Sequence, residues 1–263
     1  MQVKGGGFPI LVPCVAGVDV HKETAVVCVR RAKADGTVEE FVKTYGTVTR
    51  ELLAMMDWLV AVGVTHVGME STGVYWKPIY NILEGNFTVA LANAQRVRNV
   101  PGRKTDVKDS QWLAHLLQCG PLEASFIPDR PQRELRDVTR ERVQIGAEKA
   151  RVGNRIQKVL EDANIKLGSV ASDVLGVSGR EMIRALIEGE TDPEKLANLA
   201  RRRLRGKIPQ LKLALEGRMQ EHHRFMLDHH LKHLEFVERL IEDLSVRVEE
   251  LLRPNEEAVE RLT

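Results

Sequence analysis

The sequence is poor in cysteine, in aromatic residues and in long apolar runs. Its 263 residues include only three cysteines, Cys14, Cys28 and Cys119, which are widely spaced and form no C-x-x-C pair. This spacing disfavours a disulfide framework and a thiolate zinc site, and it fits a reducing cytoplasm. The longest uncharged stretch, residues 5–18, is too short to span a bilayer and lacks a small-residue cleavage signal. We therefore expect a cytoplasmic protein with neither a membrane span nor a signal peptide.

Net charge is also small, because 39 basic and 37 acidic residues sum to +2. The sum hides an uneven layout. Residues 1–127 hold 25 charged residues, residues 128–263 hold 51, and every tryptophan and tyrosine lies in the first part. Such a change in composition predicts two domains, 1–127 and 128–263, joined at the proline-bounded segment 128–131.

The first part alternates short apolar runs with amphipathic stretches, which is typical of a mixed sheet with flanking helices. An antiparallel opening is predicted, since two apolar runs are joined by the polar turn at residues 21–24. Strands are expected at 15–20, 25–31, 37–43, 64–69 and 87–91, and helices at 49–62, 74–83 and 106–118. The predicted fold class is therefore α/β, followed by an all-α domain.

The second part is predicted to be almost entirely helical. Its last helix carries apolar residues at spacings of 3, 4, 3, 4 and 3, which is typical of a coiled-coil seam. A second seam runs through residues 135–159, where Arg142 and Lys149 occupy two of its positions. We expect the chain to form dimers through the seam of the last helix, which consists of Leu234, Val237, Ile241, Leu244, Val248 and Leu251.

Four carboxylates stand out by their positions. Asp19 interrupts the apolar run of the first strand, Glu70 follows the strand at 64–69, and Asp106 and Asp109 lie three residues apart at the start of a helix. Strand ends and helix starts are where sites gather in sheets of this class. Carboxylate oxygens suit Mg²⁺, and two such ions can assist displacement at a phosphodiester. The four acids are therefore candidate metal ligands and catalytic residues.

Each acid also has a plainer explanation. Asp106 can be a helix N-cap, Asp109 can complement the helix dipole, and Glu70 can be a solvated strand end. Asp19 is harder to explain in this way, because a carboxylate buried among valines and alanines is costly unless it is paired.

Basic residues form three groups that suit a polyanionic partner. One precedes the acidic helix, another lies on the first long helix, and the third is the run 201–212, with six basic residues and no acidic one. For Arg142 and Lys149, ion pairing to the acidic last helix is an alternative to nucleic-acid binding, and for the third group a solvated face is the alternative. The candidate nucleic-acid-binding residues are Arg96, Arg98, Arg103, Lys104, Lys108, Arg142, Lys149, Arg201, Arg202, Arg203, Arg205 and Lys207.

Five of the eight histidines fall within residues 222–233. A metal site there is one interpretation, and a polar residue that sets the register of the seam at His230 is the other. Ser71 lacks the G-x-S-x-G context of a serine hydrolase.

Three segments carry a resemblance to a known family. The segments at 17–22, 68–76 and 103–110 hold all four acids, and together they resemble the signature of DEDD-class insertion-sequence transposases, the one-ten family of bridge-RNA-guided recombinases. The resemblance implies an RNase H-like, RuvC-like domain whose Mg²⁺ ligands are Asp19, Glu70, Asp106 and Asp109. It also implies that the helical part mediates dimer formation and contacts RNA.

The resemblance further implies a mechanism and its partners. Family members assemble as tetramers around a structured bridge RNA, whose loops pair with target DNA and donor DNA. Strand exchange uses a covalent serine–DNA link, with the serine in a C-terminal domain. The sequence ends within acidic helical sequence at Thr263, where that domain would be expected to follow. We assign no nucleophilic serine and expect this chain alone to lack strand-exchange activity.

Three other functions are compatible with parts of the sequence. A stand-alone two-metal nuclease resembling a junction resolvase would use the same acids, and a non-catalytic RNA-binding scaffold would use the helical part. A phosphotransferase related to sugar kinases would need glycine-rich phosphate loops, which the turn at 21–24 lacks.

Overall fold

The computed structural model describes residues 9–71, 73–93, 97 and 108–255. The chain divides into two compact units, Met1–Ile127 and Pro128–Thr263. Each unit has its own hydrophobic core. Among the described residues, no helix combines the length and the apolar character needed to cross a membrane.

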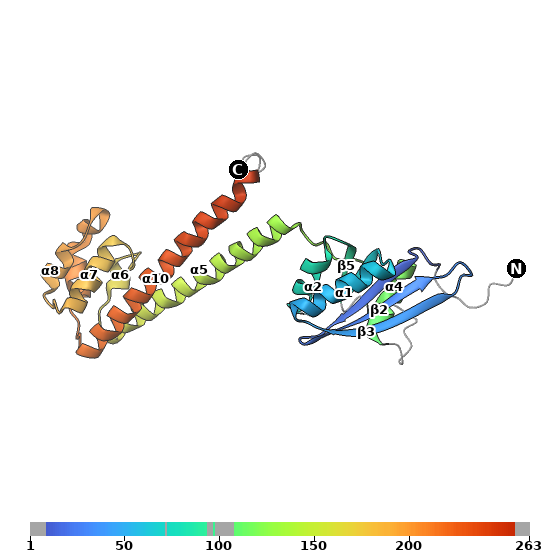
Figure 1. Cartoon of the computed structure of the whole chain (residues 1–263). Coiled ribbons are helices and arrows are strands. Elements are labelled where there is room, and N and C mark those ends of the chain that lie inside the picture. Colours follow the sequence, from blue (N-terminus) through green and yellow to red (C-terminus); the bar gives the residue numbers. More distant parts are fainter. Residues whose placement is uncertain (1–8, 72, 94–96, 98–107, 256–263) are drawn as a thin grey trace. The chain divides into compact units, whose positions relative to one another are not determined.

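The first unit contains a five-stranded sheet with the order β3-β2-β1-β4-β5 (Figure 1). Strands β1, β2 and β3 are antiparallel neighbours, whereas β1, β4 and β5 run parallel. This order and these directions are those of the RNase H-like fold, so the expected α/β fold class is confirmed. The strands are β1 (Cys14–Val20), β2 (Thr24–Ala32), β3 (Val38–Gly46), β4 (His66–Glu70) and β5 (Thr88–Ala92).

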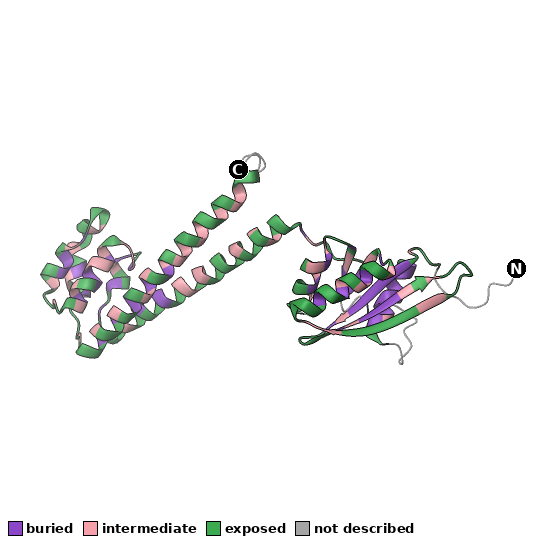
Figure 2. Ribbon diagram, viewed as in Figure 1, coloured by how far each residue is buried: buried purple, intermediate pink, exposed green. Residues whose placement is uncertain are grey.

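Helices cover both faces of this sheet. Helices α1 (Thr49–Val62) and α2 (Trp76–Leu83) pack on the face that carries Ala16, Val18 and Val20 of β1. Helix α4 (Asp109–Cys119) packs on the opposite face, against Val15 and Gly17. Because side chains alternate between faces along a strand, β1 is buried on both sides, and it lies in the purple interior of Figure 2.

The strand and helix limits differ slightly from the sequence-based prediction. Strand β4 extends to Glu70, so this carboxylate belongs to the strand itself and is only partly exposed. Helix α4 begins at Asp109, and the expected earlier start at residue 106 lies outside the described residues.

The second unit is built on an antiparallel pair of long helices, α5 (Arg130–Asp162) and α10 (Glu221–Leu252) (Figure 1). Helix α5 begins where Asp129 accepts a hydrogen bond from the Gln132 N–H at 3.1 Å and proline occupies the first turn. Between the long helices lie α6 (Leu167–Val170), α7 (Val177–Glu188), α8 (Pro193–Asn198), the 3₁₀ helix η1 (Arg202–Lys207) and α9 (Ile208–Ala214), and η2 (Arg253–Asn255) follows α10.

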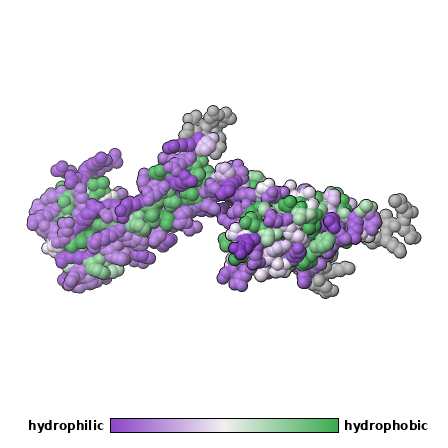
Figure 3. All heavy atoms as spheres, in the orientation of Figure 1, coloured by the Kyte–Doolittle hydropathy of each residue, from purple (hydrophilic) through white to green (hydrophobic). Residues whose placement is uncertain are grey.

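Burial changes along this helical pair. At one end Val152 and Ile156 of α5 and Leu227 and Leu234 of α10 are fully buried in the core of the unit. Toward the other end the apolar residues of both helices are half-buried or, like Val143 and Val246, exposed. Apolar side chains coloured green are visible among polar ones along the pair in Figure 3.

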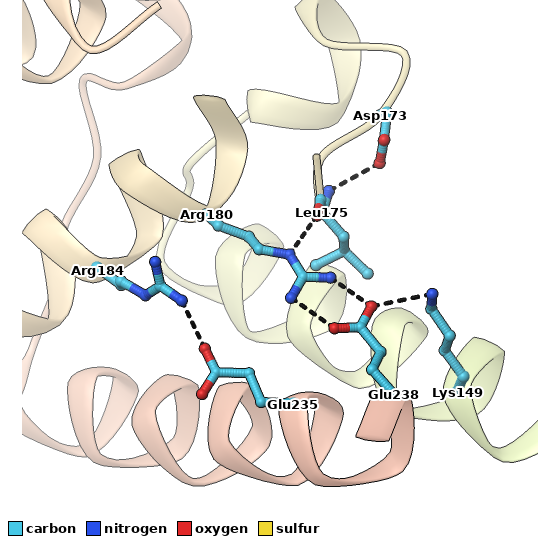
Figure 4. A network of polar contacts seen from close by, with 7 residues as sticks. All are labelled: Lys149, Asp173, Leu175, Arg180, Arg184, Glu235 and Glu238. Atoms are coloured by element: carbon cyan, nitrogen blue, oxygen red, sulfur yellow. Dashed lines mark hydrogen bonds and ion pairs between the residues drawn. The ribbon is translucent and has the colours of Figure 1, made fainter. Parts of the chain in front are cut away.

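A polar network ties α7 to both long helices (Figure 4). Arg180 of α7 donates hydrogen bonds to both carboxylate oxygens of Glu238 on α10, at 2.6 and 2.7 Å. Lys149 of α5 lies 2.9 Å from the same carboxylate. The Arg180 hydrogen bonds and those of Lys149 lower the pKa of Glu238 to about 2, although burial opposes them. Glu238 therefore remains charged at neutral pH and holds three helices together.

Candidate active site

Strands β1 and β4 bring Asp19 and Glu70 to neighbouring positions. In the parallel register Gly17 is opposite Gly68 and Val18 is opposite Met69, so Asp19 and Glu70 are the next residues of the two strands. Neighbouring strands are about 4.8 Å apart. Asp19 shares a face with Gly17, and Glu70 shares a face with Gly68. The two carboxylates therefore project from the same edge and the same face of the sheet.

Helix α4 brings Asp109 to the same region. A Cβ atom on Gly17 would lie 2.2 Å from the Ser110 carbonyl oxygen and 2.4 Å from the Ala114 nitrogen, so only glycine allows α4 to approach β1 this closely. The contact is two residues before Asp19 on the strand and one residue after Asp109 on the helix. The backbones of β1, β4 and α4 therefore place Asp19, Glu70 and Asp109 at one edge of the sheet, although their carboxylate oxygens do not all lie within 4.8 Å of one another. Asp106 lies outside the described residues.

Asp19 has an unexpected neighbour in His21. The Nε2 atom of His21 lies 3.2 Å from Oδ2 of Asp19, and the side chains are 61% and 27% exposed, respectively. No lysine or arginine in the described part of the chain forms an ion pair with Asp19. Asp19 and His21 are two residues apart, and side chains at this spacing lie on the same side of an extended chain. The sequence could therefore have indicated this pair.

The residues of this site fit a hard divalent cation. The donor set consists of carboxylate oxygens, which Mg²⁺ and Mn²⁺ prefer. Asp19 and Glu70 are partly exposed and Asp109 is exposed, so a polyanionic substrate could reach an ion held by them. Negative charge placed at the start of α4 also interacts favourably with the helix dipole, which stabilises Asp109 there.

A chain of polar contacts holds α4 against the sheet. Gln111, in the first turn of α4, donates from Nε2 to Oε2 of Glu40 on β3 at 3.0 Å. The other Glu40 oxygen accepts a hydrogen bond from Arg30 of β2. Arg30 also donates from Nε to Oε1 of Gln118, near the end of α4, at 3.0 Å. Arg30 and Glu40 thus connect both ends of α4 to the β2–β3 hairpin, and we call these four residues the α4 clamp.

His115 lies on α4 between the two glutamines of the α4 clamp. Burial lowers the pKa of His115, Arg30 lowers it further, and Glu40 acts in the opposite direction. The imidazole is therefore neutral at pH 7, and α4 carries no additional positive charge beside the acids.

The described serines near the acids have structural surroundings. Ser110 is fully buried at the contact with Gly17, and its Oγ forms no hydrogen bond among the described residues. The N–H of Ser71 donates to the carbonyl of Ala92 at 3.0 Å, which extends the pairing of β4 with β5. No histidine is hydrogen-bonded to either hydroxyl within the described residues.

The candidate nucleic-acid-binding residues have different surroundings. Lys108 is exposed at the N-cap of α4. Lys149 pairs with Glu238 of α10, as in the ion-pairing alternative, whereas Arg142 contacts α10 by a hydrogen bond of 2.8 Å to Ser245 Oγ. Residues 201–207 form an exposed basic segment at η1. Arg96, Arg98, Arg103 and Lys104 lie outside the described residues.

The predicted dimer seam is partly used within the chain. Leu234 and Val237 are buried, with 0% and 1% exposure, where α10 packs on the rest of its own unit. Ile241, Leu244, Val248 and Leu251 are half-buried beside α5. The seam therefore has two parts, and only the second retains apolar surface for another chain.

The histidine-rich segment comes close to one carboxylate. Asp162, His222 and His223 place one ligand atom each within 4.8 Å of one another, an arrangement that could hold a metal ion. However, Nδ1 of His223 accepts the Gln220 N–H at 3.1 Å, so its proton is on Nε2, which lies 2.9 Å from Oδ2 of Asp162. Coordination of a metal through Nε2 would move this proton to Nδ1. Nδ1 could then no longer accept the Gln220 N–H, and the hydrogen bond at the start of α10 would be lost. In this arrangement His223 serves as a helix cap.

The chain matches a known protein family. The family model DEDD_Tnp_IS110, described as Transposase, matches residues 16–165, more than half of the chain. The matched range includes Asp19, Glu70, Asp106 and Asp109, and the family resemblance of the sequence is thereby confirmed. No curated protein matches the chain.

Several solved structures are similar to the chain. RuvC of Thermus thermophilus has a TM-score of 0.32 and 12% identity, over 43% of this chain and 99% of that one. The same protein in complex with a Holliday junction substrate gives 0.30 and 11%, over 43% and 99%. The Fowlpox virus resolvase in complex with Holliday junction DNA gives 0.27 and 15%, over 35% and 65%.

Proposed function

The chain belongs to the DEDD transposase family of the IS110 type, and from this premise we propose that its first unit carries the metal-dependent centre of a DNA recombinase. Transposases break and rejoin DNA, so their active sites must stabilise charge at a phosphodiester. The observation that supports the proposal is the placement of Asp19, Glu70 and Asp109 at one edge of the sheet by three separate elements, with α4 held against β1 by the close contact at Gly17. Asp106 completes the ligand set by its place in the motif.

Each residue of the site has a separate task in this proposal. The four carboxylates hold the cation, and His21 orients Asp19 by a hydrogen bond to Oδ2. A bound Mg²⁺ would offset the negative charge that builds up on the phosphodiester oxygens. The α4 clamp positions Asp109 relative to the strand ends, because it joins the first turn of α4 to the β2–β3 hairpin.

We further propose the partners implied by the family. These are a bridge RNA, donor and target DNA, and other copies of the chain. Strand exchange would proceed through a covalent serine–DNA link, and no serine of this chain is assigned to that link. The exposed basic segment at η1 supports a polyanionic partner for the second unit.

The half-buried end of the α5–α10 pair supports self-association. Ile241, Leu244, Val248 and Leu251 present apolar surface there. We expect a dimer in analytical ultracentrifugation at micromolar concentration, and a monomer after Leu244→Glu with Val248→Glu. Leu213→Glu is the matched control, because Leu213 is 71% exposed on α9, away from the seam. A monomeric wild-type chain would contradict this assignment.

Titration with a divalent metal tests the proposed centre. Mg²⁺ or Mn²⁺ binding, measured by calorimetry, should weaken in Asp19→Asn and in Asp109→Asn by about tenfold or more, equal to at least about 1.4 kcal/mol. The matched control is Asp57→Asn, which removes the same charge from an exposed position on α1. Added Mg²⁺ should also raise the Tm of the wild type and not that of Asp19→Asn. Equal affinities in all four proteins would refute the metal centre.

Incubation of the chain with branched DNA distinguishes a recombinase from a nuclease. If the chain alone, supplied with Mg²⁺, hydrolyses a four-way junction and Asp19→Asn does not, the function is that of a resolvase-like nuclease. If metal binds and no hydrolysis follows, the recombinase proposal stands.

A further inference from the structure

The second unit contains a cavity of about 1240 Å³ beside its most basic segment. One wall is formed by the end of α6 and the first turn of α7, and the other by Arg201 and η1. Arg201, Arg202, Arg203 and Lys207 line it, whereas Arg205 of the same segment does not. The basic run 201–212 is therefore divided by the fold, with four of its six cations at the cavity and two, Arg205 and Lys212, away from it.

The basic wall is fastened to α7 by polar contacts. The Arg201 N–H donates to Ser178 Oγ at 2.8 Å, and Arg201 Nε lies 3.0 Å from a Glu181 oxygen. Lys207 donates from Nζ to the Val170 carbonyl at 2.9 Å. These contacts join the two ends of the basic segment to the opposite wall, so the cavity has fixed sides.

Between these anchors, Arg202 has a left-handed backbone conformation with φ of +46°. Such a conformation is costly for a residue other than glycine, and costs of this kind gather at binding sites. Arg202 and the following Arg203 are both exposed. Neither guanidinium group pairs with a carboxylate among the described residues. Two cations are thus available to a ligand.

The acids of the cavity do not cancel this charge. Asp173 accepts the Leu175 N–H at 3.1 Å, and Glu181 is paired with Arg201. Four cations against these two acids leave an excess of two positive charges. The start of α7, a helix of 12 residues, also lines the cavity and adds the partial positive charge of its N–H groups.

We propose that this cavity is a phosphate-binding site that holds the backbone of a nucleic acid through Arg202 and Arg203. Guanidinium groups bind phosphate oxygens by paired hydrogen bonds, which lysine cannot reproduce. The inference deepens the proposed function and rests on it for the identity of the polyanion. It assigns phosphate binding to the cavity, and it excludes Arg205 as a principal contact although Arg205 belongs to the same basic run.

Binding of a labelled single-stranded RNA of about 12 nucleotides, followed by fluorescence anisotropy, tests the site. We expect Arg202→Ala and Arg203→Ala each to weaken binding about fivefold to tenfold, equal to about 1–1.4 kcal/mol. Each should also reduce the slope of log K against log salt by about 0.7, the value for one lost phosphate contact on a single strand. The matched control is Arg205→Ala, which removes the same charge from the same segment and should change affinity less than twofold.

Two competitors identify the chemistry that is bound. Inorganic phosphate, compared with chloride at equal ionic strength, should displace RNA from the wild type and from Arg205→Ala and have less effect on Arg202→Ala. Single-stranded DNA of the same sequence should bind with the same dependence on the variants, because the site reads phosphate. Equal losses in all three arginine variants would overturn the proposal in favour of a diffuse basic surface. Preferential binding of an acidic peptide would overturn it in favour of a protein partner.

The outcome is separate from that of the metal titration. Loss of metal binding in Asp19→Asn depends on the first unit alone. It can therefore be observed whether or not Arg202→Ala and Arg205→Ala differ in RNA affinity. If the three arginine variants bind RNA equally well while Asp19→Asn loses metal binding, the phosphate-binding site is refuted and the proposed function is retained.

Discussion

Gln111 and Glu40 are 71 residues apart in the sequence and are joined by a hydrogen bond of 3.0 Å. Gln111 belongs to the first turn of α4, two residues after Asp109, whereas Glu40 belongs to the edge strand β3. Gln111 Oε1 also lies 3.4 Å from the N–H of Lys108, the N-cap of the helix. One side chain therefore connects the start of the acidic helix to the far side of the hairpin, and the geometry of the proposed metal site depends on it.

Removal of Glu40 should destabilise the first unit. Glu40→Ala leaves Arg30, whose side chain is 16% exposed, without its carboxylate, and it leaves Gln111 without an acceptor. We expect a loss of about 1.5–3 kcal/mol in the free energy of unfolding, as for hydrogen bonds to charged groups. Tryptophan fluorescence during urea denaturation reports this unit alone, because Trp58, Trp76 and Trp112 all lie in it.

The neighbouring residue provides the control for that experiment. Glu39 also pairs across the hairpin, yet its partners Arg31 and Lys33 are 45% and 46% exposed. Exposed ion pairs contribute less than about 1 kcal/mol, so Glu39→Ala should have a small effect. If the two substitutions cost the same, the α4 clamp has no special role.

A side chain at Gly17 should separate α4 from β1. Gly17→Ala would place Cβ within 2.2–2.4 Å of backbone atoms of α4, and backbone atoms cannot move aside as the end of a side chain can. We expect a loss of at least about 2 kcal/mol in stability, at the upper part of the usual range for overpacking, together with weaker metal binding. Gly85→Ala is the control, because nothing lies within 4 Å of its would-be Cβ. Unchanged stability in Gly17→Ala would refute the close contact.

Much of this fold and part of the site could be predicted from the sequence. Asp19 stood out because a carboxylate within a buried apolar strand needs a reason, and the parallel register then placed Glu70 beside it. The motif that carries the family membership contained the same acids. The α4 clamp could not be predicted in this way, because Arg30, Glu40 and Gln118 are ordinary polar residues until the hairpin register and the helix position bring them together.

The apolar seam shows a different limit of sequence reasoning. A spacing of three and four residues shows that one face of α10 is apolar, but it does not show which surface covers that face. Leu234 and Val237 are covered by the chain itself. Lys149 was similarly ambiguous, because its position in the sequence fits both nucleic-acid binding and ion pairing with the last helix. Its ion pair with Glu238 depends on the packing of α5 beside α10, which the spacing does not show.

The ion pair of Arg180 with Glu238 should make the second unit sensitive to acid. The folded-state pKa of Glu238 is about 2, below its ordinary value of 4.5. Its contribution to stability is therefore present above pH 4.5 and is lost as the pH falls toward 2. Glu238→Gln should reduce stability by about 1.5–3 kcal/mol at pH 7, measured by circular dichroism at 222 nm, and the difference from wild type should shrink between pH 4.5 and 2.

The same helix again supplies a control. Glu235, three residues earlier on α10, pairs with Arg184, and both side chains are more exposed, at 40% and 52%. Glu235→Gln should change stability by less than about 1 kcal/mol. If Glu238→Gln has an effect as small as that of Glu235→Gln, the network of Figure 4 does not hold the three helices together.

Replacement of His230 should stabilise the second unit. His230 is 8% exposed on α10, and its Nδ1 has no hydrogen-bond partner in the described part of the chain. Burial lowers its pKa, and His229, Arg155 and His233 lower it further. A histidine whose folded pKa is lowered costs stability as the pH falls through its unfolded value of about 6.5. His230→Leu should therefore raise the free energy of unfolding by about 1 kcal/mol at pH 7.5, and its advantage over the wild type should grow at pH 5.5.

His229→Leu is the control, because His229 lies at an exposed position on the same helix. Its stability should remain within about 0.5 kcal/mol of wild type at pH 7.5. A loss of stability in His230→Leu would mean that the buried imidazole sets the register of α10 against α5 and contributes more than its desolvation costs.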